Sequence, residues 1–63
     1  MEKRVLLRSL RQVAVGKGVD LVFVRQGSRH EVYAINGVLL PVPRHNEIAK
    51  GLALDLIQAA KEA

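Results

Sequence analysis

The chain contains no cysteine and no tryptophan, and it has only one phenylalanine, one tyrosine and two prolines. Without cysteine, neither a disulfide framework nor a thiolate metal site can form, which is typical of proteins in a reducing compartment. No apolar run approaches the roughly eighteen residues of a membrane span, and the amino-terminal residues lack the apolar core of a signal peptide. We therefore expect a soluble cytoplasmic protein.

The length of 63 residues allows one domain. A domain of this size buries only about 60% of the surface that its unfolded chain exposes, so its margin of stability is small. No repeat, low-complexity tract or change of composition divides the sequence. We expect a single domain over residues 1–63.

Basic residues are concentrated in the first half of the chain. Residues 1–30 carry seven Lys or Arg against two Asp or Glu, whereas residues 31–63 carry three against four. The whole chain has a formal net charge of +4 and a sequence pI near 10.1. This balance is typical of proteins that bind nucleic acid or an acidic protein, although a solvated basic surface has the same composition.

An amphipathic helix is predicted from Glu2 to about Val15, because apolar residues recur there at helical spacing and most basic residues fall on the other side. Gly16 and Gly18 then supply a helix stop and a flexible connection. A row of basic residues on this helix can contact phosphate, but solvent is the commoner partner of such a face. The row consists of Arg4, Arg8 and Arg11.

Two strands are predicted around the turn Gly27-Ser28. Residues 21–26 are rich in β-branched and aromatic side chains, and the second strand covers about residues 29–35. We assign Phe23 to the core. Tyr33 either stacks on a base or belongs to ordinary sheet packing, which is the commoner role of a lone aromatic residue on a strand.

The pair Asn36-Gly37 closes the second strand and is the strongest short signal for a hairpin. The third strand covers residues 38–42. Because Pro41 has no backbone N–H to donate, this strand belongs at an edge of the sheet or close to its own end. Pro43 then ends the strand.

The last helix has two possible starts. A start at Asn46 would use its side chain as a cap but would place Gly51 inside the helix, so we prefer a start near Lys50. Leu54 lies on the polar side of this helix and is a candidate contact for a partner. The expected apolar face consists of Leu52, Ala53, Leu56, Ile57 and Ala60.

The order of these elements is helix, strand, strand, strand, helix. It predicts an α+β fold in which two helices pack on one face of a three-stranded antiparallel sheet. Side chains alternate along the second strand, so His30, Val32 and Ala34 share one face, and Arg29, Glu31 and Tyr33 share the other.

His30 is the only histidine in the first forty residues, and Arg25 and Arg29 lie close to it in sequence. An imidazole, with an ordinary pKa near 6.5, can both accept and donate a proton, and guanidinium groups match phosphate oxygens. By pattern alone, a strand histidine is more often partly buried than catalytic. A metal site is not expected, because the adjacent residues His30 and Glu31 point to opposite faces.

Two linked motifs span much of the chain. Residues 27–33 read Gly-Ser-Arg-His-Glu-Val-Tyr and residues 42–45 read Val-Pro-Arg-His, followed by Glu47-Ile48 and Lys50-Gly51. With the predicted order of elements, these motifs resemble the HicA family of toxins from bacterial toxin-antitoxin pairs. Arg29 stands where many members carry histidine, and Leu52 stands where members often carry threonine.

The resemblance implies a fold similar to the double-stranded-RNA-binding domain and an endoribonuclease that cleaves messenger RNA and is held inactive by a HicB antitoxin. The catalytic histidine of the family follows a Gly-Ser/Thr-x-His pattern, and the matching residue is His30. Cleavage through the 2′-hydroxyl of RNA needs neither a metal nor another cofactor. The expected RNA contacts are Arg25, Ser28, Arg29, Arg44, His45 and Lys50.

Two alternatives stay open. A non-catalytic RNA-binding module of the same shape would have no cleavage to lose when His30 is replaced. An interaction protein with a basic face for an acidic partner would show no measurable affinity for RNA at moderate salt, where phosphate contacts are already weakened.

Overall fold

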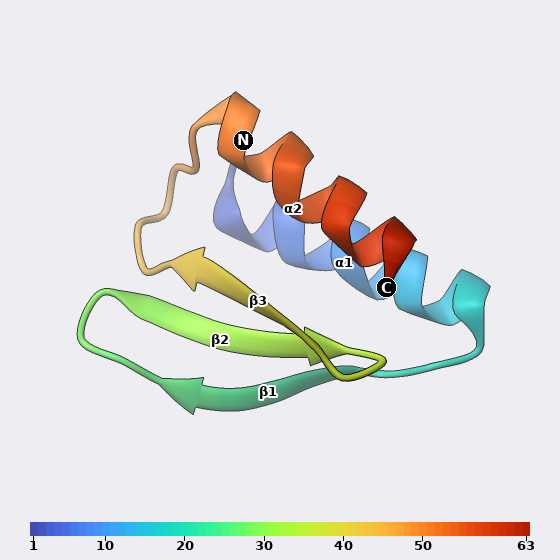
Figure 1. Cartoon of the computed structure of the whole chain (residues 1–63). Coiled ribbons are helices and arrows are strands. Elements are labelled where there is room, and N and C mark those ends of the chain that lie inside the picture. The colour runs from blue at the N-terminus through green and yellow to red at the C-terminus, as the bar shows by residue number, and fades with distance from the viewer.

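Two helices lie side by side on one face of a three-stranded sheet (Figure 1). The structure is a computed structural model that describes residues 1–63. The strands are antiparallel and lie in the order β1-β2-β3, so the predicted α+β fold is confirmed. In chain order the elements are α1 (Lys3–Lys17), β1 (Leu21–Gln26), β2 (His30–Ile35), β3 (Val38–Pro43) and α2 (Lys50–Glu62).

The core lies between the helices and the inner face of β2 and β3. No residue of β1 is buried, so this strand extends beyond the helical layer. Apolar side chains at helical spacing on α1 and α2 meet alternate residues of the two strands. The core cluster consists of Leu6, Leu10, Ala14, Tyr33, Ile35, Leu40, Val42, Ile48, Ala53, Leu56 and Ala60.

The prediction that Phe23 belongs to the core is wrong. Its side chain is 52% exposed, because the core reaches β1 only at its start, where Leu21 is partly buried. The Phe23 ring packs edge-on against the ring of Tyr33, with the centroids 5.4 Å apart. Tyr33 itself is buried in the core cluster, so its role is sheet packing.

Helix α1 is longer than predicted. It continues through Gly16 to Lys17 and ends at Gly18, which adopts a left-handed conformation with φ 73°. The Gly18 N–H donates to the carbonyl oxygens of Ala14 and Val15. Gly16 is therefore not a helix stop, and the cap at Gly18 alone ends the helix.

The hairpin between β2 and β3 is confirmed. Asn36 and Gly37 both have positive φ, at 51° and 83°, as a two-residue hairpin turn with the right twist requires. Strand β3 is an edge strand and contains Pro41, as predicted, and it continues one residue further to Pro43.

Helix α2 begins at Lys50, which confirms the preferred start. Its buried face is formed by Ala53, Leu56 and Ala60, and Leu54 is exposed as expected. Leu52 is also exposed, so its place in the apolar face was wrong. Neither helix has the length and apolar character required to cross a lipid bilayer.

The segment between β3 and α2 has no regular structure, but it is fixed to the start of the chain. The Lys3 N–H donates to the Asn46 carbonyl at 2.8 Å, and the Ile48 N–H donates to the Met1 carbonyl at 2.7 Å. The Ile48 side chain is fully buried. The Met1 ammonium also donates to the Ile48 carbonyl at 2.8 Å and to Glu47 Oε2 at 2.6 Å. This segment is therefore held by several bonds to the first three residues and by one core side chain.

We expect Ile48→Ala to lower the free energy of unfolding by about 2–4 kcal/mol, because it leaves a cavity in the core. Urea unfolding followed by circular dichroism measures this change. Leu54→Ala removes an exposed leucine from α2 and is the control, with an expected change of less than about 0.5 kcal/mol. Equal effects of the two variants would contradict the anchoring role of Ile48.

Candidate functional site

His30 lies on the face of the sheet that the helices do not cover. It is the first residue of β2 and pairs with Pro43 of β3. Tyr33 and Ile35 of the same strand point into the core. Alternation therefore places His30, Val32 and Ala34 on the opposite face. The predicted alternation is therefore confirmed within β2, and the imidazole of His30 is exposed to solvent. Arg29 precedes β2 and lines the same surface depressions as His30, so its predicted place on the face of Glu31 and Tyr33 is wrong.

Two adjoining depressions meet at His30. They share Ser28, Arg29 and His30. Pro43, Arg44 and His45 complete the first depression. The second is completed by Arg25, Gly27, Val32 and Pro41.

The structure thus brings five of the six predicted RNA contacts to His30. Arg25, Arg29, Arg44 and His45 reach it from three different segments of the chain, together with Ser28. Lys50 does not line either depression and stands at the start of α2. The depressions are open, and the cationic side chains around them attract anionic ligands.

Arg44 holds the turn that presents His30. Its Nη1 donates to the carbonyl oxygens of Gly27 and Ser28 at 3.5 and 3.4 Å. With the Gln26 amide oriented so that its oxygen faces the guanidinium, that oxygen accepts from Arg44 Nη2 at 2.8 Å. The Arg44 backbone N–H also donates to the Arg29 carbonyl at 3.1 Å. Part of the Arg44 guanidinium is therefore already hydrogen-bonded within the protein. The sequence did not indicate these bonds.

Gly27 allows the turn to close tightly. Its N–H donates to the His30 carbonyl at 2.7 Å, and a Cβ at this position would lie 3.3 Å from the same oxygen. That distance is shorter than ordinary van der Waals contact, so a larger residue would push against the backbone of His30. A change in the turn at Gly27 would therefore shift the backbone of His30.

A polar cluster on the inner face fixes the start of β2. Lys3 Nζ of α1 lies 2.7 Å from Glu31 Oε1, and both side chains are 19% exposed. The hydrogen bond from Lys3 lowers the pKa of Glu31. Tyr33 Oη donates to the same carboxylate at 3.2 Å, and burial, with the Glu31 charge, raises the pKa of Tyr33.

Sequence reasoning missed this cluster, although alternation does place Glu31 on the helix-facing side. The pairing depends on which turn of α1 crosses β2, and no local pattern encodes that crossing. Because Glu31 directly follows His30, the ion pair anchors the backbone that carries the imidazole.

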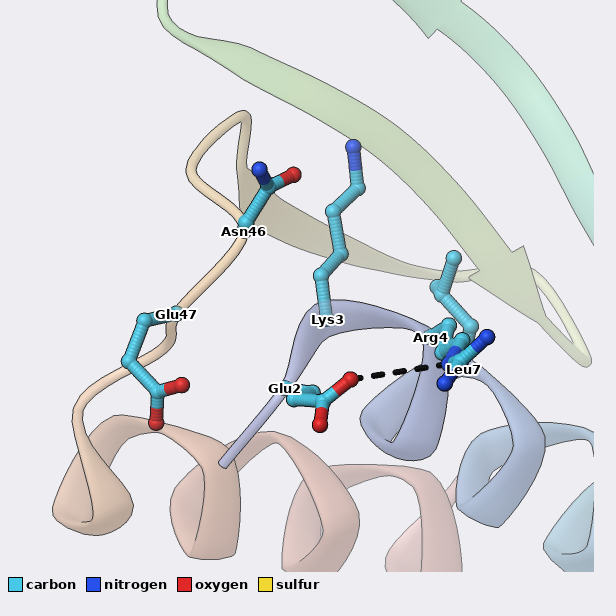
Figure 2. Close-up of a pocket in the computed structure, with 6 residues that line it drawn as sticks. All are labelled: Glu2, Lys3, Arg4, Leu7, Asn46 and Glu47. Carbon is cyan, nitrogen blue, oxygen red and sulfur yellow. Dashed lines mark ion pairs between the residues drawn. The ribbon is translucent and has the colours of Figure 1, made fainter.

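A separate depression lies beside the start of α1 (Figure 2). Lys3 extends from the first turn of α1 toward the sheet, while Asn46 and Glu47 come from the segment before α2. Glu2 Oε2 and Arg4 Nε form an ion pair at 3.5 Å. Charges of both signs line this depression together with Leu7, so it has less attraction for phosphate than the region around His30.

The comparisons with known proteins found no matching family model, curated protein or solved structure.

We expect Glu31→Gln to destabilise the fold by about 1 kcal/mol at neutral pH, because it removes a mostly covered ion pair. The folded state lowers the pKa of Glu31 below 4.5, so the unfolded state binds more protons as the pH falls below that value. The stabilisation is therefore complete above about pH 4.5 and disappears as the pH falls through the folded-state pKa.

Urea unfolding of both proteins from about pH 7 down to about pH 3 checks this expectation, since the two stability curves must converge on the acid side. Asp55→Asn is the matched control, because Asp55 is exposed and forms no ion pair. A Glu31→Gln curve that stays parallel to that of the original protein would refute the role of the ion pair.

Proposed function

We propose that this chain is a toxin endoribonuclease of the HicA type, which cleaves messenger RNA without a metal ion and uses His30 as its catalytic residue. The observation that carries the proposal is the setting of His30. It is exposed on the open face of the sheet, next to a tight turn, where cationic side chains from separate segments meet. The Gly-Ser-x-His motif supplies the turn and the histidine together.

The central position of β2 supports a catalytic role. This strand pairs with β1 on one side and with β3 on the other, so its backbone is held along its whole length. A proton-transfer group must be held close to its reaction geometry to be effective. His30 combines a fixed backbone with a side chain that a large substrate can reach.

In the proposed reaction, His30 accepts the proton of a ribose 2′-hydroxyl as the 2′-oxygen attacks the adjacent phosphorus. The bond from phosphorus to the 5′-oxygen breaks, and that oxygen takes up a proton. The products are a 2′,3′-cyclic phosphate and a 5′-hydroxyl end. His45 is the other histidine of the chain and lines the same depression, so it is the candidate donor of the second proton.

The arginines take different parts in this proposal. Arg25 and Arg29 line the depressions without a protein acceptor for their side chains, so they are the candidates for phosphate contacts. Arg44 mainly positions the turn and adds positive charge. Lys50 stands outside the depressions, at the start of α2, and adds positive charge to the chain.

The proposed partner is a HicB-type antitoxin that covers His30 and supplies negative charge. The open site and its arginines offer such a protein an accessible, cationic surface, and Leu54 on α2 offers an apolar contact elsewhere. Modification of histidine by diethyl pyrocarbonate tests the masking. The reagent must reach His30 in the free chain and not in the complex, and equal reactivity in both would refute it.

The central experiment is incubation of the chain and of its His30→Ala variant with a defined messenger RNA in EDTA. We expect the cleavage rate to fall by about 10²- to 10⁴-fold in the variant, because general acid-base catalysis is lost. Affinity for RNA should stay nearly unchanged, as measured by fluorescence anisotropy. Mapping of the RNA ends identifies the cyclic phosphate.

Arg8→Ala is the control for charge, since it removes an exposed cation on α1 away from both depressions. It should leave the cleavage rate within about threefold of the original. Cleavage that survives in His30→Ala would refute the assignment. RNA binding without cleavage by either form would instead favour the non-catalytic RNA-binding module.

A further inference from the structure

The two edges of the sheet differ in their chemistry. Strand β3 carries Pro41 and Pro43, which have no N–H to offer a neighbouring strand. Strand β1 has no proline, and none of the backbone hydrogen bonds outside the helices and strands involves residues 20–26. The outer side of β1 is therefore an open edge with nothing beside it (Figure 1).

This open edge is also apolar. Val22, Phe23 and Val24 are consecutive, and their exposed fractions are 51%, 52% and 47%. An edge strand that combines exposed apolar side chains with unpaired backbone groups is a template for pairing with another strand. Natural edges usually carry charges, prolines or a β-bulge. Here the charges stand only at the two ends of the apolar run, at Asp20 and Arg25, and a bulge lies near the end of the strand.

A β-bulge turns Arg25 to the outer face of the sheet, and Asp20, which directly precedes β1, would share that face if the alternation from Val22 continues by two residues. Phe23 pairs with Tyr33 of β2, whereas Arg25 pairs with Val32, the next residue along. Val24 is thus the extra residue, and Arg25 shares the outer face with Val32 and Val22. Without the bulge, alternation would put Arg25 on the inner face with Phe23.

We propose that β1 pairs antiparallel with β1 of a second copy of this chain, about a twofold axis at Val22. Directly opposite residues of an antiparallel pair share a face, so Val22 would meet its own counterpart on the outer face. Because Val24 is the extra residue of the bulge, Asp20, two residues before Val22, would lie opposite Arg25, three residues after Val22 in the other copy. On the inner face, Leu21 would lie opposite Phe23.

The edge is self-complementary in this arrangement. Two Asp20 to Arg25 pairs flank an apolar centre, and the isologous geometry uses the same residues twice. The two sheets would join into one six-stranded sheet. The exposed ring of Phe23 would then be partly buried against the second copy. The argument for the dimer does not depend on the proposed chemistry at His30. Arg25 belongs to both, because it lines the depression there and would face Asp20 of the second copy in the dimer.

The dimer should be weak, with a Kd between about 10 µM and 1 mM, because one strand edge is smaller than the roughly 800 Å² per partner of stable complexes. Sedimentation equilibrium over this concentration range measures it. Hydrogen exchange of the β1 amides, followed by NMR, gives a second readout, since protection must increase with protein concentration.

Charge reversal tests the register. Asp20→Arg and Arg25→Asp place like charges opposite each other, so each should weaken the dimer by at least about tenfold. The double variant restores opposite charges and should return the Kd to within about threefold of the original. Asp55→Arg changes the net charge as much as Asp20→Arg does, but on α2, and should leave the Kd unchanged.

A chain that is monomeric at the highest concentration would overturn the proposal. A dimer that the double variant does not rescue, or that forms without protection of the β1 amides, would overturn it as well. The substituted residues, Asp20 and Arg25, are both exposed, so the single variants should keep the fold. Far-ultraviolet circular dichroism verifies this.

Discussion

Strand β2 has two faces, and the rest of the structure depends on the difference between them. Toward the helices it presents Glu31, Tyr33 and Ile35, of which the last two are buried. Toward solvent it presents His30 at its first position. Because burial of the inner residues fixes the register, a slip of one residue would turn His30 into the core and expose Tyr33 and Ile35. Stability of the fold and orientation of the imidazole are therefore set by the same packing.

The site needs little structure of its own. The turn, the first residue of β2 and the residues after β3 are placed together by antiparallel pairing, since the start of β2 lies opposite the end of β3. The Arg44 side chain, which follows β3, then donates hydrogen bonds to the carbonyl oxygens of Gly27 and Ser28 in the turn before β2. In a domain with so few buried residues, this arrangement leaves the core intact, because the polar and charged groups of the site all lie outside it.

Much of the fold could be predicted from local signals. Asn36-Gly37 fixes the hairpin because few residue pairs accept two positive φ values, and the prolines mark the edge strand because they lack a donor. Alternation predicted the face of His30. The hairpin, the edge strand and the face of His30 each depend on the properties of one or two residues or on their local spacing.

The errors concern relations between elements. Phe23 is large and apolar like a core residue, but the core reaches β1 only at Leu21. Gly16 disfavours a helix, yet α1 continues past it because the left-handed cap is at Gly18. The Lys3 to Glu31 ion pair and the bonds of Arg44 join residues that are distant in sequence. Such contacts depend on where a helix crosses the sheet, which no local pattern encodes.

The backbone bonds from Lys3 to Asn46 and from Ile48 to Met1 also bear on when the site becomes complete during folding. The two hairpins close short loops and can form early, whereas these bonds close almost the whole chain and come at a higher entropic cost. Asn46 and Ile48 are held by that late closure, whereas Pro43 and Arg44 are already held beside His30 by the pairing of β2 with β3. A partly folded chain can therefore present the turn, His30 and Arg44 before the segment that follows His45 is fixed.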